Sequence, residues 1–183
     1  MMKFKFLTFL LAAVTVVLAA CGTDDGSSED GGEMDHAEMD HSSSGEVPDD
    51  LAQAEDPEYP VDSQAVINAE HMKGMDGAEA TVTGAFDTTA YSVTYTPTTG
   101  GEPVEDHKWV IHEEIEDAGD APFEAGDEVV LEAAHMEGME GAEATIDSAE
   151  DTTVYMVSYT DTETGDEVEH HKWVTEEELT QAE

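Results

Sequence analysis

Positive charge is nearly absent from this sequence. Its 183 residues hold 46 Asp and Glu against 5 Lys and Arg, and every one of the five is a lysine, so the formal net charge is −41. Phosphates of nucleic acids and anionic membrane surfaces repel a chain this acidic. We therefore expect no nucleic-acid partner and expect cations instead.

Cysteine and long apolar runs are also scarce. Cys21 stands alone, so it cannot form a disulfide within the chain. The apolar run Phe6 to Ala20 is too short to span a membrane comfortably and, with lysines before it, is typical of a secretory signal. Small residues before Cys21 are typical of a bacterial lipoprotein. We predict a signal peptide over residues 1–20, lipidation of Cys21, and an anchor on the extracellular face of the cell membrane.

The chain after Cys21 divides into a polar segment and a duplication. Residues 21–58 are rich in Gly, Ser, Asp and Glu, and this composition predicts a disordered acidic tether. The sequence then repeats itself at a constant offset of 64 residues. A repeat this long is typical of one small domain copied once. We predict module 1 over residues 59–120 and module 2 over residues 121–183.

Each module shows the pattern of short β-strands. Residues 92–96 alternate around β-branched and aromatic side chains, and 98–102 form a turn with two glycines. Residues 109–115 are expected to end in a short helical or 3₁₀ turn. We predict an all-β fold of two tandem small SH3-like barrels or curled sheets, and because such modules are marginal alone, we expect the two copies to dock.

Methionine and histidine occur together far more than packing requires. Apart from Met1, Met2 and Met156, every methionine lies near a histidine, in the tether or in two glycine-containing loops. Thioether sulfur selects Cu(I), and imidazole suits Cu(II), Zn and Ni. With no free thiol, the pattern favours copper, and Cu(I) over Cu(II). The tether ligands are predicted to be Met34, His36, Met39 and His41, and the loop ligands His71, Met72, Met75, His135, Met136 and Met139.

Other residue types leave alternatives open. Met72 or Met75 could instead fill the end of a barrel. His107 and His171 each precede Lys-Trp-Val, and we interpret them as packing residues. Tyrosines and tryptophans at alternating positions could form a stacking platform, but more often form a half-buried sheet. No nucleophile lies in a catalytic motif, so the sequence indicates no enzyme.

The duplicated His-Met-x-Gly-Met-x-Gly-Ala pattern, followed by Thr-x-Tyr and His-Lys-Trp-Val, resembles the YdhK family of Gram-positive lipoproteins. The resemblance covers residues 61–183 and extends to the signal and Cys21. The family includes the copper-resistance lipoprotein CopL, so the resemblance implies extracellular copper binding through the loop histidines and methionines. The extreme acidity of this chain departs from the family.

Together these observations predict a lipid-anchored lipoprotein of the cell envelope that binds, sequesters or buffers copper and so gives copper resistance. Its partners would be copper ions, the membrane through the lipid, and a copper exporter that receives the ions. The alternative is a structural or interaction module that binds wall polymer or a protein through its sheet aromatics.

Overall fold

A computed structural model describes residues 42–182, which lie within one compact unit. The predicted signal peptide, Cys21, and the four tether ligands Met34, His36, Met39 and His41 lie outside the described residues, so their roles stay predictions. Among residues 42–182, no helix is long and apolar enough to cross a membrane.

The described chain forms strands and two single-turn 3₁₀ helices. Both 3₁₀ turns follow the Lys-Trp-Val strands, as the sequence predicts for the first copy. In chain order the elements are β1 (Ala52–Gln53), β2 (Gln64–Ile67), β3 (Glu79–Tyr95), β4 (Val104–Ile111), η2 (His112–Glu114), β5 (Glu128–Val130), β6 (Glu143–Thr160), β7 (Glu167–Thr175), η3 (Glu176–Glu178) and β8 (Leu179–Gln181).

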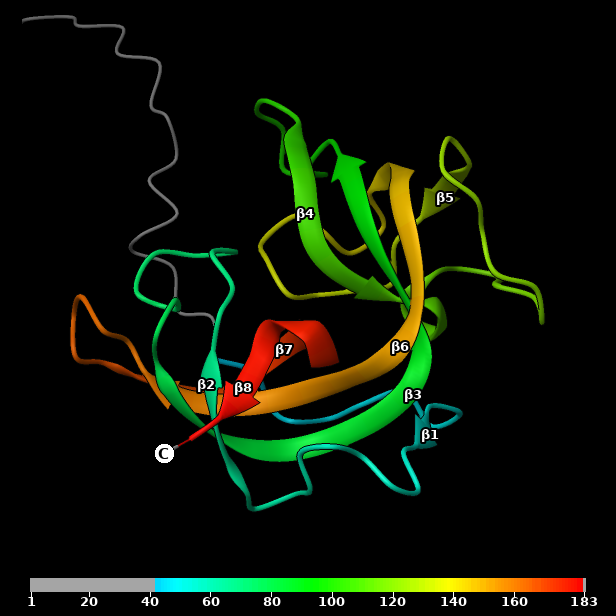
Figure 1. The fold of residues 1–183 in the computed structure, drawn as a ribbon. Coiled ribbons are helices and arrows are strands. Elements are labelled where there is room, and N and C mark those ends of the chain that lie inside the picture. Colours follow the sequence, from blue (N-terminus) through cyan, green and yellow to red (C-terminus); the bar gives the residue numbers. More distant parts are fainter. Residues whose placement is uncertain (1–41, 183) are drawn as a thin grey trace, which may run out of the picture. The chain divides into compact units, whose positions relative to one another are not determined.

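Two long antiparallel strands, β3 and β6, form the centre of one eight-stranded sheet, and Figure 1 shows them curving side by side. The sheet continues from β3 through β2 to β8 and from β6 to β5, while β1 and β4 also pair with β3 and β7 with β6. The all-β class is confirmed. Of the two architectures predicted, the curled sheet is the one that these strands form.

The pairing of β3 with β6 has twofold symmetry within one chain. Its register runs from Ala80 opposite Tyr159 to Tyr95 opposite Ala144, and Thr88 lies opposite Thr152, its counterpart in the other repeat. When a residue of one repeat pairs with a residue of the other, their two counterparts, 64 residues away, also pair with each other. This is the geometry of an isologous dimer interface, here formed between two halves of one polypeptide.

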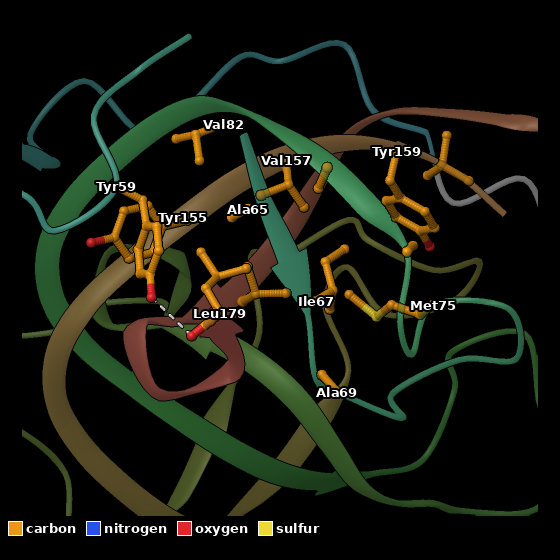
Figure 2. Close-up of a cluster of buried hydrophobic side chains, with 14 of the residues drawn as sticks. Tyr59, Ala65, Ile67, Ala69, Met75, Val82, Tyr155, Val157, Tyr159 and Leu179 are labelled. Carbon is orange, nitrogen blue, oxygen red and sulfur yellow. Dashed lines mark hydrogen bonds between the residues drawn. The ribbon is translucent and has the colours of Figure 1, made fainter. Parts of the chain in front are cut away.

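The apolar side chains gather in clusters that mix the two repeats. Core A combines residues from Tyr59 to Ala85 with residues from Tyr155 to Leu179, and the close-up in Figure 2 shows Met75 in this cluster with Ile67 and Tyr159. Core B uses the continuous stretch from Tyr91 to Ile146, which joins the second half of repeat 1 to the first half of repeat 2. Each repeat thus contributes to both cores.

A third cluster lies around the two tryptophans and includes Leu51, Phe86 and Met156. Trp173 is fully buried and Trp109 nearly so, and the tyrosines of β3 and β6 are buried as well. These aromatic side chains therefore do not form an exposed stacking platform. They belong to the interior of the sheet, and they are more deeply buried than the half-buried positions we predicted.

The prediction of disorder as far as residue 58 differs from the structure. Ser43 donates its backbone N–H to the Glu169 carbonyl of β7, and its hydroxyl donates to the carbonyl of His170. Leu51 is buried, and β1 pairs with β3. Composition misses this because backbone hydrogen bonds to a sheet edge need few apolar side chains.

The buried tyrosines predict an abnormal alkaline titration. Burial raises the pKa of all five, and it raises the pKa of Tyr159 to about 12 with help from the charge of Asp161. Because the folded state holds these protons more tightly, their stabilisation is complete below about pH 10, the unfolded value, and is lost as pH rises toward the folded pKa. Tyrosinate absorbance should appear together with loss of near-ultraviolet circular dichroism. Ionisation near pH 10 with the fold intact would contradict this.

Candidate metal-binding site

The two His-Met-x-Gly-Met loops owe their shape to glycines with left-handed backbone angles. Gly74 and Gly77 have φ of 74° and 76°, and Gly138 and Gly141 have 78° and 76°. Glycine takes this conformation without the steric cost that a Cβ brings. Each loop thus turns sharply between two strands, β2 and β3 in the first copy.

The glycines also predict a graded mutational effect. An alanine Cβ at Gly74 would lie 2.1 Å from Asp161 Oδ1, whereas at Gly77, with nearly the same φ, it would meet nothing within 4 Å. Asp161 is itself held by the backbone N–H groups of Glu163 and Thr164. We expect Gly77→Ala to cost about 1 to 2 kcal/mol from backbone strain alone and Gly74→Ala to cost clearly more. Chemical denaturation of both variants measures the difference, and equal losses would show that Asp161 moves freely.

In the first loop, His71 contacts a glutamate of the opposite repeat. Its Nε2 lies 2.7 Å from Oε1 of Glu178 in η3, and the indole Nε1 of Trp109 donates to Oε2 of the same carboxylate at 2.9 Å. Burial by itself raises the pKa of Glu178, but the hydrogen bond and charge of His71, with further hydrogen bonds, bring that pKa below its ordinary value.

The second loop repeats the arrangement with the repeats exchanged. His135 Nε2 lies 2.9 Å from Oε1 of Glu114 in η2, and Trp173 Nε1 donates to Oε2 of Glu114 at 3.1 Å. Burial raises the pKa of Glu114, and the charge of His135 and its hydrogen bonds more than offset this, so the pKa lies below its ordinary value. Glu114 and Glu178 are counterparts 64 residues apart.

These contacts set the tautomer of both histidines. A carboxylate only accepts, so each Nε2 carries the hydrogen that it donates, and the form of the ring that can bind a metal has its lone pair on Nδ1. The Nδ1 atoms of His71 and His135 are buried and have no hydrogen-bond partner among the described residues. Metal-ligating histidines in proteins commonly have this arrangement: one ring nitrogen donates a hydrogen bond to a carboxylate, and the other nitrogen offers its electron pair to the metal.

The loop methionines fall into two classes. Met75 and Met139 are fully buried in core A and core B, where they fill space between apolar side chains. Met72 and Met136, next to the two histidines, are only partly buried and lie at the margins of these cores. The Tyr95 hydroxyl lies 3.8 Å from the Met136 sulfur. The structure thus places Met75 and Met139 as the packing alternative describes, whereas Met72 and Met136 stay predicted ligands.

Sequence reasoning missed the two glutamates, which were lost among 46 acidic residues. Two signals single them out: each is the last residue of a 3₁₀ turn after Lys-Trp-Val, and the repeat alignment pairs them. Among the residues that the structure describes, no group of three or more His, Cys, Asp or Glu is arranged to hold a metal ion.

Comparison with known proteins identifies relatives along most of the chain. A family described as "Protein of unknown function (DUF1541)" matches residues 61–112 and 125–176. The uncharacterized protein YdhK of Bacillus subtilis is 56% identical over 178 residues, which cover 94% of this chain and 87% of that protein.

Solved structures show the same similarity. A crystal structure of the DUF1541 family protein ydhK from Bacillus subtilis matches with a TM-score of 0.77 and 63% identity, covering 80% of this chain and all of that one. A solution structure of the ydhK C-terminal domain matches with a TM-score of 0.64 and 66% identity, covering 67% of this chain and 92% of that one.

Proposed function

Because the chain belongs to the DUF1541 family, whose description names no activity, we propose from the loop geometry that it binds Cu(I) and holds it outside the cell. The observation that carries the proposal is the pair of buried Nδ1 atoms on His71 and His135, each on a ring whose Nε2 is hydrogen-bonded to the glutamate that ends a 3₁₀ turn. A partly buried methionine follows each histidine in the chain.

The donor set favours a soft ion. Nitrogen from imidazole and sulfur from thioether suit Cu(I), whereas hard cations such as Mg²⁺ or Ca²⁺ take oxygen ligands. The carboxylates of Glu114 and Glu178 orient the rings through Nε2. The negative surface raises the local concentration of cations without selecting among them.

The biological role would be sequestration. The predicted lipid anchor at Cys21 would keep the protein on the extracellular face of the membrane, and the Met-Asp-His motif of residues 34–41 would add ligands on a tether. Bound copper would be kept from the membrane or passed to an exporter. The competing role, a wall-binding module using its aromatics, has less support because those side chains are buried.

Competition titration of Cu(I) against a chelator tests the proposal. We use the full chain with Met34, His36, Met39 and His41 replaced, so that only the loops report. His71→Gln with His135→Gln should weaken binding by more than the 10- to 100-fold typical of a lost outer-shell partner. His112→Gln, which removes an imidazole elsewhere, is the control. Unchanged affinity in the double variant would refute loop binding.

A second set of variants separates ligand methionines from core methionines. Met72→Leu and Met136→Leu should weaken Cu(I) binding, whereas Met75→Leu, Met139→Leu and Met156→Leu should leave it unchanged because leucine keeps the apolar volume. Zn²⁺ and Ni²⁺ titrated in parallel should show no dependence on methionine. An equal loss from Met75→Leu would make the buried methionines ligands as well.

A further inference from the structure

Beyond the loop residues, the second repeat's site contains another imidazole, that of His107 in β4. Its ring centroid lies 6.2 Å from that of His135, with the two rings tilted by 40°. The two residues lie at positions 107 and 135 of the chain, and the packing of β4 and the loop in core B brings them together. The interpretation of His107 as packing alone did not anticipate this neighbour.

The spacing of the two rings suits a shared ion. A metal about 2 Å from one nitrogen of each ring lies roughly 3.2 Å from each ring centroid, so two imidazoles on one ion have centroids no more than about 6.4 Å apart. The observed separation is within this limit and near its upper end. It therefore fits a wide angle at the metal, which low-coordinate Cu(I) accepts.

The surroundings bring a third donor to the same place. Tyr95 packs edge-on against His107 at 5.8 Å between ring centroids, and its hydroxyl reaches the Met136 sulfur at 3.8 Å. One tyrosine of β3 thus contacts both the second imidazole and the methionine that adjoins His135. The Nδ1 of His135 and the Nε2 of His107 are both buried.

We infer that His107 and His135 bind one Cu(I) ion together, with the sulfur of Met136 as a third ligand. This inference rests on the proposed function and adds to it a ligand from the Lys-Trp-Val strand. Because Glu114 and His107 belong to repeat 1 and His135 and Met136 to repeat 2, the site is complete only when both repeats are present. His171, the counterpart of His107, packs edge-on against Tyr159, but the Tyr159 hydroxyl has no hydrogen-bond partner among the described residues, unlike that of Tyr95, so the inference is confined to the site of His107 and His135.

The test uses the full chain with the four tether ligands replaced, and Cu(I) as the probe. His107→Gln should weaken one Cu(I) binding event more than tenfold and leave any other unchanged. His112→Gln, on the residue directly after β4, is the matched control. Thermal unfolding of each metal-free variant shows whether the fold survives the change.

A measurement without substitutions guards against a variant that misfolds. In the nitrogen-15 spectrum of the histidine side chains, Cu(I) should shift one ring nitrogen of His107 together with Nδ1 of His135. If His135 responds and His107 does not, the two-histidine site is wrong while loop binding stands. If neither responds and the His71 and His135 variants bind normally, the proposed function fails as well.

Discussion

Replacing Glu114 with alanine is expected to lower the free energy of unfolding by about 3 kcal/mol or more, one of the two largest effects that the structure predicts. The carboxylate accepts hydrogen bonds from His135, from Trp173 and from the backbone N–H of Ile111, and it is almost completely buried. Its removal leaves these donors without an acceptor in the protein interior, where each unsatisfied donor costs about 1 to 3 kcal/mol. Denaturant unfolding followed by tryptophan fluorescence measures the change.

Three comparisons identify the cause. Glu116→Ala removes an exposed carboxylate two residues away and should change stability by less than about 0.5 kcal/mol. Glu114→Gln keeps the shape but turns an amide N–H₂ toward another donor, so much of the loss should remain. Glu178→Ala should cost less than Glu114→Ala, because the Glu178 side chain is 17% exposed against 8% for Glu114. A Glu114→Ala variant as stable as Glu116→Ala would mean that water replaces the carboxylate.

Local patterns predicted the elements of this fold. Alternation over residues 92–96 indicated a strand, and the residues after Trp109 indicated a 3₁₀ turn, because both depend on neighbours in the sequence. The strand is longer than expected, since β3 continues from Glu79 to Tyr95 through positions whose alternation is weak. Pairing with β6 along this length supplies the regularity that the side chains lack.

Long-range relations could not be read from the same patterns. The repeat alignment shows that His71 and His135 are equivalent. It would be the same whether each histidine were hydrogen-bonded to the glutamate of its own repeat or to the glutamate of the other repeat. Only the pairing of β3 with β6 decides that His71 contacts Glu178 and His135 contacts Glu114. Tertiary packing likewise decides which methionines are buried. Met72 and Met75 belong to one motif, but Met75 lies inside core A and Met72 is only partly buried at its margin.

Cutting the chain between the repeats and separating the halves is expected to abolish folding of each half as a monomer. Residues 59–120 alone would lose β6, the partner of β3 along its whole length, and β8, the partner of β2. They would also lose the part of core A that Tyr155 to Leu179 contribute. A chain of about 60 residues buries only about 60% of its surface even when its core is complete. Far-ultraviolet circular dichroism and proton NMR of each half should show an unfolded chain.

The matched control keeps both halves together. Cleavage at a protease site inserted between Asp120 and Ala121, both exposed in the loop before β5, should leave a folded complex, because no strand is interrupted. Mixing the separated halves should restore its spectrum. Because Thr88 faces its own counterpart Thr152, either half can also meet a second copy of itself in the same register, so any folded material from one half should have the mass of a dimer. A folded monomeric half would show that one repeat can close a core unaided, and the clusters that mix both repeats would then be dispensable.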